Sequence, residues 1–322
     1  MNIKNIIKEI SNNKEIGIKE VFLVACGGSL VDMYASQYFL QSESINLRIL
    51  SYTSNEFVHA TPKSLGKNSV AVICSHGGNT PETVEACKVA KKNGASTITL
   101  THNENAELIK YSDHNIMYVW GNETNVKDNP MAIILNIALE ILNQTEGYEH
   151  YDKFIEGLNI VDTIVKKGQL LVKNRAKKFA ERYKDEPITY VLSSGASFGH
   201  AYGFSICSLM EMQWMNASPI HSGEYFHGPF EVTDKETLYL LLVNEGRTRP
   251  LDERVLNFLN KYGEKVEVVD CKELGINTIH DSVVEFFNPI LFYSILCVYR
   301  SELSKIRNHD LDTRRYMGKV NY

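Results

Sequence analysis

The sequence has no cysteine arrangement of the kind that binds a metal or forms a disulfide framework. Its six cysteines are scattered through apolar segments, and none belongs to a CxxC motif or a cluster with histidines. Such a distribution is typical of buried, reduced thiols. We therefore expect no metal site, and no other cofactor is indicated.

Long hydrophobic runs and an excess of positive charge are also missing. No stretch of about 18 uncharged apolar residues occurs, so we expect no membrane span. The net charge of −5 argues against a nucleic-acid surface or a polybasic membrane anchor. The amino-terminal segment mixes charges with apolar residues and does not look like a signal peptide. We expect a cytoplasmic protein without nucleic-acid or membrane partners.

The chain repeats itself at a nearly constant spacing. An apolar strand and small-residue turn end at Ser29, and a segment of the same form ends at Ser197, 168 positions later (197 − 29). Pro81 and Pro250 follow the next pair of apolar strands and differ by 169 positions (250 − 81). Each copy alternates short apolar strands with amphipathic helical runs, which predicts parallel sheets covered by helices on both faces.

We expect two tandem α/β domains of the doubly wound, flavodoxin-like type. The first domain is placed at residues 1–150, the second at 151–305, and a carboxyl-terminal tail at 306–322. Ligands of such open sheets bind at the carboxyl ends of the strands, near the point where strand order reverses.

Two loops of the first domain have the composition of an anion site. They read Cys26-Gly-Gly-Ser29 and Ser75-His-Gly-Gly-Asn-Thr80, and each follows a strand and precedes a helical run. Glycines let backbone N–H groups approach an anion, and helix N-termini attract negative charge. Neither the Walker pattern nor the GxGxxG dinucleotide pattern occurs. The predicted phosphate-binding residues are Gly28, Ser29, Ser75, His76, Gly77 and Thr80.

These loops could instead be ordinary turns with helix caps. Ser29 and Asp32 have the spacing of a capping box, and Thr80 followed by Pro81 suits the start of a helix. The occurrence of two such loops at adjacent strand ends favours the phosphate site. The second copy carries Arg247 and other residues in place of the hydroxyl-rich loop, so we expect only one copy to bind phosphate.

One carboxylate stands inside an apolar run of the second copy. Residues 204–215 are apolar almost all round, so we expect this helix, and Glu211 within it, to be buried. Burial would raise the pKa of Glu211 toward that of a general base, although a structural glutamate bonded to a buried donor is the alternative. His227 follows in a loop shaped by glycine and proline and is the candidate proton carrier. Glu224 is a rival carboxylate or an orienting group for His227.

The tail is rich in cations and also carries Tyr316 and Met317, which an ordinary disordered end would lack. We expect the tail to fold over the active site, with Lys319 or an arginine such as Arg315 facing an anionic substrate. Charge that is simply solvated is the alternative. Ser197, in the turn of the second copy, is a possible supporting residue.

The sequence resembles the SIS (sugar isomerase) family over essentially its whole length. The two glycine loops look like the phosphate-binding loops of that family. Glu211 and the His227-Gly-Pro229 loop look like the base and the ring-opening histidine in the isomerase half of glucosamine-6-phosphate synthase. Asp312, Arg315 and Lys319 resemble the tail of that enzyme, whose lysine reaches into the site. No glutamine-hydrolysing domain is present, so we expect no synthesis from glutamine.

The resemblance is more specific to the fructoselysine 6-phosphate deglycase group. One departure is Gly77, where the pattern usually has a serine, so the predicted phosphate site loses a hydroxyl. The matching blocks are Val24-Ala-Cys-Gly-Gly-Ser29, Gly78-Asn-Thr-Pro-Glu-Thr83, Met210-Glu-Met-Gln-Trp214, Gly223-Glu-Tyr-Phe-His-Gly-Pro-Phe-Glu231 and Arg314-Arg-Tyr-Met317.

The resemblance implies two SIS domains and a cofactor-independent reaction. Fructoselysine 6-phosphate and water would give glucose 6-phosphate and lysine, by proton transfer through an enaminol and an imine. The resemblance also implies a homodimer or higher homo-oligomer with a shared active site, in which His227 acts either within its own subunit or on the site of the neighbouring subunit. An amino-sugar phosphate isomerase or deaminase, or a glucoselysine 6-phosphate deglycase, would use the same residues. A non-catalytic sugar-phosphate sensor is the alternative of another class.

Overall fold

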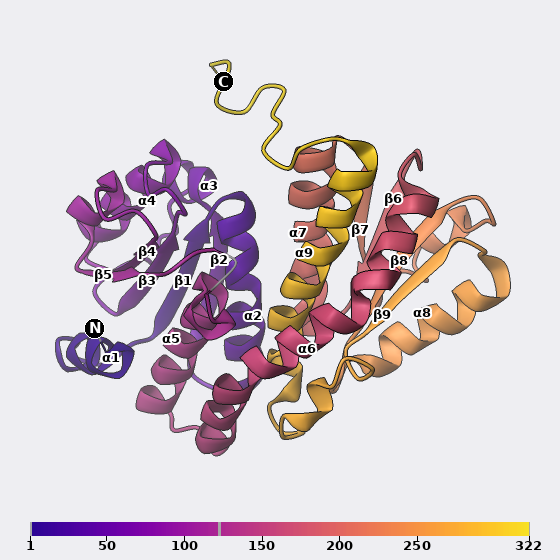
Figure 1. Cartoon of the computed structure of the whole chain (residues 1–322). Coiled ribbons are helices and arrows are strands. Elements are labelled where there is room, and N and C mark those ends of the chain that lie inside the picture. Colours follow the sequence, from indigo (N-terminus) through magenta and orange to yellow (C-terminus); the bar gives the residue numbers. More distant parts are fainter. Residues whose placement is uncertain (1, 122–123, 322) are drawn as a thin grey trace. The chain divides into compact units, whose positions relative to one another are not determined.

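The computed structural model describes residues 2–121 and 124–321 and divides the chain into two compact units (Figure 1). The first unit spans Met1–Leu158 and the second Asn159–Tyr322. The division falls inside the long helix α6 (Tyr151–Tyr183). Each unit builds its own parallel sheet, which confirms the predicted α/β class.

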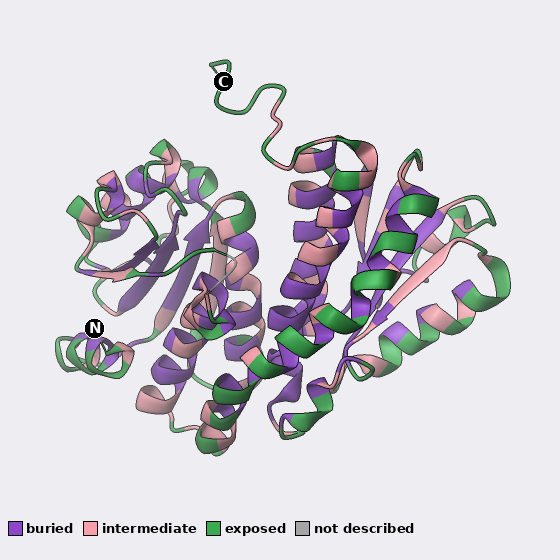
Figure 2. Ribbon diagram, in the orientation of Figure 1, coloured by how far each residue is buried: buried purple, intermediate pink, exposed green. Residues whose placement is uncertain are grey.

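The first sheet has the strand order β2-β1-β3-β4-β5, and all neighbouring strands are parallel. This is the flavodoxin-like order, in which strand order reverses between β1 and β3. Its central strand β3 is buried along its whole length, because helices cover both faces (Figure 2). The strands are β1 (Glu20–Ala25), β2 (Arg48–Thr53), β3 (Ser69–Cys74), β4 (Ser96–Thr101) and β5 (His114–Met117).

Two groups of helices cover the first sheet. Helices α2 (Gly27–Glu43) and α5 (Pro130–Thr145) pack on each other, and α1 (Ile3–Asn12) packs on α5. Helices α3 (Ser54–His59) and α4 (Pro81–Lys92) pack together over the apolar core on the other face. Two short 3₁₀ helices, η1 (Glu107–Tyr111) and η2 (Val126–Asp128), complete the unit.

The second sheet has the order β7-β6-β8-β9, again all parallel. Its strands are β6 (Thr189–Ser193), β7 (Ala217–His221), β8 (Leu238–Val243) and β9 (Val266–Asp270). The helices that follow α6 are α7 (Phe198–Gly203), α8 (Arg249–Tyr262), α9 (Asn288–Arg307) and a π-helix, η4 (Phe204–Glu211). Short 3₁₀ helices lie at η3 (Gly195–Ser197), η5 (Pro229–Val232), η6 (Ile276–Thr278) and η7 (Val284–Phe286). Among the described residues, no helix is long and apolar enough to cross a bilayer.

Of the two predicted helix starts, the one at Thr80 is confirmed and the one at Ser29 is wrong. Helix α2 begins at Gly27 with Cys26 at its N-cap, and no side chain caps it. Ser29 is therefore the third residue of the helix, and the predicted capping box of Ser29 with Asp32 is wrong. Helix α4 begins at Pro81 with Thr80 at the N-cap, as predicted, although the Thr80 side chain makes no capping hydrogen bond.

Candidate active site

The carboxyl ends of β1 and β3 carry the two glycine loops side by side. Val24 of β1 pairs with Ile73 of β3, so Cys26 and Ser75 follow neighbouring strands at the same edge of the sheet. Helix α2 starts inside the first loop, at Gly27, and helix α4 starts directly after the second loop, on the opposite face of the sheet (Figure 1). Both helices thus direct the free N–H groups of their first turns toward the strand-order switch point. That arrangement suits an oxyanion.

The two loops, residues 26–29 and 75–80, form the candidate anion site, which we call the cradle. Three of its glycines leave it open. An added Cβ at Gly27, Gly28 or Gly77 would meet no heavy atom within 4 Å. At Gly78, in contrast, an added Cβ would lie 2.8 Å from Thr101 Oγ1, because this residue packs on the next strand. The loop is therefore anchored at Gly78 and has room for an anion in front of the other glycines.

The structure brings together two of the three predicted hydroxyl donors. Ser75 Oγ lies 3.1 Å from Thr80 Oγ1 and accepts a hydrogen bond from the Gly78 N–H at 3.2 Å. Ser29 instead lies beside the thiol of Cys74 at the end of β3, and burial is the main cause of the raised pKa of that thiol. A phosphate at this site would thus find the hydroxyls of Ser75 and Thr80 already paired with each other.

Asp32 lies one turn after Ser29 on α2 and close to Cys74. Burial raises the pKa of Asp32 to about 8. The carboxyl group is therefore mostly protonated at neutral pH, and it does not oppose an anion in the neighbouring cradle.

His76 belongs to an aromatic cluster at the rim of the cradle. Its Nδ1 lies 2.9 Å from the Tyr118 hydroxyl, and its ring centroid lies 4.3 Å from that of His102 and 5.0 Å from that of Trp120. Partial desolvation lowers the pKa of His76, and His102 lowers it further. The ring is therefore neutral at pH 7, and when Nδ1 accepts from Tyr118, Nε2 carries the proton that a phosphate oxygen would accept.

The equivalent place in the second unit, between β6 and β8, is closed. Gly195 has φ +52°, close to the +54° of Gly27, so the first turn has the same backbone form. An added Cβ at Gly195, however, would lie 2.5 Å from Thr248 Oγ1, and Ser194 Oγ donates to the Thr248 carbonyl at 3.3 Å. The loop after β6 therefore packs directly on the loop after β8.

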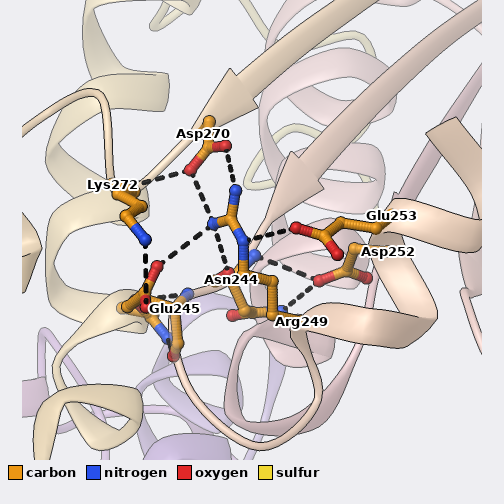
Figure 3. Close-up of polar contacts among 8 residues, drawn as sticks. Asn244, Glu245, Arg249, Asp252, Glu253, Asp270 and Lys272 are labelled. Atoms are coloured by element: carbon orange, nitrogen blue, oxygen red, sulfur yellow. Dashed lines mark hydrogen bonds and ion pairs between the residues drawn. The ribbon is translucent and has the colours of Figure 1, made fainter. Parts of the chain in front are cut away.

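Arg249 stabilises this closed loop (Figure 3). It bonds Asp270 from Nη1 at 3.0 Å and from Nη2 at 2.6 Å, and Glu253 from Nε at 2.8 Å. Its Nη1 also donates to the Asn244 carbonyl at 3.0 Å. The hydrogen bonds to Asp270 are the main cause of the raised pKa of Arg249. In the second unit this position is therefore occupied by hydrogen bonds and ion pairs between the protein's own groups.

Glu211 ends the π-helix and forms an ion pair with the tail. Its Oε1 lies 2.8 Å from Arg314 Nη2, and its side chain is 26% exposed. The prediction of a fully buried Glu211 is therefore wrong. The residue pattern of the run is apolar, but the π-helix turns this end outward, and the neighbouring Met210 is exposed. Helices of this kind are frequent at functional sites.

The tail docks beside Glu211 through two arginines. Arg314 Nη1 donates to the Leu311 carbonyl at 2.6 Å, and the Arg315 guanidinium lies 4.3 Å from the centre of the Trp214 ring. Lys319 Nζ donates to the Arg314 carbonyl at 2.5 Å, so it closes a turn within the tail. Arg314, and not Lys319, is the tail cation in contact with Glu211.

His227 is exposed on a loop that buried neighbouring residues hold in place. Tyr225 is fully buried and its hydroxyl lies 2.5 Å from Thr233 Oγ1, while Gly228 has φ +133°. The His227 N–H donates to the Glu224 carbonyl at 2.9 Å, and both side chains are exposed. Within residues 2–121 and 124–321, no hydrogen bond or ion pair joins either side chain to Glu211. Ser197 is fully buried.

Known proteins share both the sequence and the fold of this chain. The SIS domain pattern matches residues 17–139, which include both cradle loops. Fructosamine deglycase FrlB of Bacillus subtilis (strain 168) is 40% identical over 305 residues, which cover 95% of this chain and 93% of that protein. The chain belongs to the SIS family. Within the family it falls in the deglycase group, so the resemblance inferred from its sequence blocks is confirmed.

Two further proteins are similar to this chain along most of its length. Fructoselysine 6-phosphate deglycase of Escherichia coli (strain K12) is 24% identical over 94% of this chain and 86% of that protein. A crystal structure from Salmonella typhimurium LT2, assigned to the phosphosugar isomerases, is 45% identical with a TM-score of 0.97. It covers 100% of this chain and 96% of that one.

The ion pair between Arg314 and Glu211 was not predicted from the sequence. Arg314 stands inside a recognised block, but nothing local distinguishes it from Arg315, and its partner Glu211 lies far away along the chain. Two adjacent arginines behind a helix were the one available signal. In the described part of the chain, no group of three or more His, Cys, Asp or Glu side chains is arranged to hold a metal ion.

Proposed function

We propose that this chain is a sugar-phosphate deglycase that acts on a 6-phosphorylated Amadori compound. Its substrate is fructoselysine 6-phosphate, and its products are glucose 6-phosphate and lysine. The observation that carries this proposal is the open anion cradle, in a chain 40% identical over 95% of its length to a fructosamine deglycase. The name of the E. coli relative supports lysine as the released amine. The second unit is a second SIS domain whose own cradle is closed.

The phosphate of the substrate binds to the first unit. The N–H groups at the starts of α2 and α4 provide the positive dipoles, and Ser29, Ser75 and Thr80 donate hydroxyl hydrogen bonds. His76 donates from Nε2, and the protonated Asp32 adds no negative charge. This site orients the sugar, and orientation is a large part of the catalysis of proton transfer.

Glu211 acts as the base in the second unit. Arg314 holds Oε1, which leaves Oε2 to remove a proton from C1 of the open-chain ketose and give an enaminol. Return of the proton to C2 leaves an imine between C1 and the nitrogen. Water then adds to C1 and the C–N bond breaks, which releases the amine and glucose 6-phosphate. The substrate's own carbonyl and nitrogen stabilise the charge, so no cofactor is needed.

His227 assists the opening of the sugar ring. Its exposed position on a firm loop suits a residue that approaches a substrate bound elsewhere. We propose that it serves the active site of a neighbouring subunit in a homodimer or higher homo-oligomer, with Lys319 of the tail near the substrate. Arg315 supports the same region, and Glu224 and Ser197 have supporting roles in the His227 loop and the first turn.

The test is incubation with fructoselysine 6-phosphate while glucose 6-phosphate and lysine are measured together. Equal amounts of both products are expected. Glu211→Gln should lower kcat at least about a hundredfold, because general base catalysis typically contributes 10²–10⁴-fold. Its affinity for glucose 6-phosphate should be unchanged, because the cradle is intact. Glu181→Gln is the matched control, since Glu181 pairs with Lys177 on the exposed face of α6.

Other outcomes identify other functions. Full activity of Glu211→Gln would remove this residue from the mechanism. Ammonia released from glucosamine 6-phosphate, with no product from fructoselysine 6-phosphate, would indicate an amino-sugar phosphate deaminase. Binding of sugar phosphates without any product would indicate a sensor.

A further inference from the structure

Trp214 has a strained backbone three residues after Glu211. Its φ is +54°, a left-handed conformation that is unfavourable for a bulky residue. Its N–H donates to the Met210 carbonyl at 3.2 Å, and its ring packs edge to face on His309 at 4.5 Å. Even so, 41% of the side chain is exposed. The strained backbone therefore does not bury the indole. Instead it leaves one face of the indole ring accessible.

Arg315 occupies that face. Its guanidinium lies 4.3 Å from the ring centre, a distance at which a cation and an aromatic ring attract each other. Stacking uses the flat face of the guanidinium and leaves its N–H donors in the plane, directed outward. Among the described residues, no carboxylate forms an ion pair with Arg315, whereas the neighbouring Arg314 is paired with Glu211. Arg315 is thus a fixed cation with donors available to an anion.

The position of Arg315 next to the Glu211–Arg314 pair limits which part of a substrate it can meet. In the proposed reaction Glu211 acts at C1, which also bears the nitrogen of the amino acid. The amino acid must therefore extend from the immediate surroundings of Glu211. The phosphate lies at the other end of the sugar and has its own cradle on the first unit.

We infer that Arg315, held on Trp214, binds the carboxylate of the amino acid attached to the substrate. This inference rests on the proposed deglycase function and adds the residue that selects amino acid adducts over other amines. A planar guanidinium suits a carboxylate because two parallel N–H···O bonds form at once. Trp214 is the positioning residue, and Arg314 keeps the base beside the same ligand.

The experiment compares two substrates that differ only in the carboxylate, fructoselysine 6-phosphate and its lysinamide counterpart. A hydrogen-bonded charge pair contributes enough to change affinity roughly tenfold. The wild-type enzyme should therefore show a KM about tenfold lower for the carboxylate substrate. Arg315→Gln should raise that KM about tenfold and leave kcat, and the KM of the amide, within about twofold. Arg182→Gln is the matched control, because Arg182 also lies over a ring, that of Tyr183, at 5.8 Å.

A second variant guards against simple loss of the tail. Trp214→Gly relieves the left-handed strain, so it should fold, but it removes the ring that holds Arg315. It should raise the KM of the carboxylate substrate and not that of the amide. Equal losses on both substrates, in either variant, would show that Arg315 anchors the tail or contacts the phosphate and would overturn the inference. If the wild-type enzyme turns over both substrates with the same KM, the inference about Arg315 is overturned and the proposed function stands. If it turns over neither substrate, the proposed function and this inference are refuted together.

Discussion

Gly77 and Gly78 adjoin in one cradle loop but have opposite surroundings. A Cβ at Gly77 meets nothing within 4 Å, and its φ is not positive, so a serine fits there without strain. We predict that Gly77→Ser restores a hydroxyl to the cradle and tightens glucose 6-phosphate binding about fivefold, since one net hydrogen bond contributes about 1 kcal/mol. Isothermal titration calorimetry measures the change. Unaltered or weaker binding would place the phosphate away from Gly77.

The neighbouring position provides the control. Gly78 has φ +68°, and an added Cβ would overlap Ala106 and Thr101. Gly78→Ser should therefore lower the free energy of unfolding by about 2 kcal/mol, as seen by denaturant unfolding. A stable Gly78→Ser variant would contradict the described loop geometry.

Asp32 predicts how phosphate binding depends on pH. Because burial raises its pKa to about 8, Asp32 is mostly neutral at pH 7 and mostly ionised at pH 9. A sugar phosphate is already dianionic at pH 7 (second pKa of about 6). The ionised Asp32 then repels it. We expect the affinity for glucose 6-phosphate to fall at least about threefold from pH 7 to pH 9. In Asp32→Asn the affinity should stay constant over this range, and an equal fall in both proteins would exclude Asp32 as the cause.

The sequence predicts cradle residues better than it predicts their partners. Strand ends and glycine loops are local features, so Ser75 and Thr80 could be placed together from the chain alone. The pairing of Glu211 with Arg314 depends on where the tail turns, and an apolar residue pattern does not reveal a π-helix. Ser29 failed as a cap because the N-cap is Cys26, three residues earlier than the spacing suggested (29 − 26).

At the scale of elements, the two copies keep one geometry and change its chemistry. Ser54 and Thr83 share a hydrogen bond of 2.9 Å in the first unit. At the corresponding places in the second unit, Ser222 donates to the Asp252 carboxylate at 2.6 Å. Burial raises the pKa of Asp252, and its hydrogen bonds to Ser222 and Asn244 oppose that rise. The repeat spacing predicted this correspondence of positions, but the exchange of an open loop for ion pairs required the structure.

Arg249 gives the prediction at this scale. Removing its side chain leaves Asp270, whose side chain is only 15% exposed, without its main cation. Arg249→Ala should therefore lower the free energy of unfolding by about 3 kcal/mol. Glucose 6-phosphate binding to the cradle should be unchanged, because Arg249 belongs to the other unit.

The control for Arg249 lies on the same helix. Arg254 is exposed and lies 4.0 Å from the centre of the Phe226 ring, so Arg254→Ala should cost only about 0.5 kcal/mol. Denaturant unfolding compares the two variants. Similar losses in both would mean that the Arg249 cluster does not stabilise the closed loop.

At the scale of the whole molecule, the proposed groups are divided between units. The cradle belongs to the first unit, while Glu211 and His227 belong to the second, and within the second unit these two side chains share no hydrogen bond or ion pair among the residues described. A duplicated fold follows from the repeat spacing. The proposed sharing of a site between subunits does not follow from it, because contacts between subunits leave no periodic pattern in a single chain.

A mixture of two inactive subunits tests this division. If His227 serves the neighbouring subunit, an equal mixture of Glu211→Gln and His227→Asn chains, refolded or co-expressed as random dimers, contains half heterodimers. Each heterodimer has one site with both residues intact, so the mixture should recover about a quarter of wild-type activity. If both residues act within one chain, every site carries a defect and the mixture stays inactive. Mixing Glu211→Gln with itself gives the baseline, and recovery no higher than that baseline would refute the shared site, because each subunit would then need its own histidine.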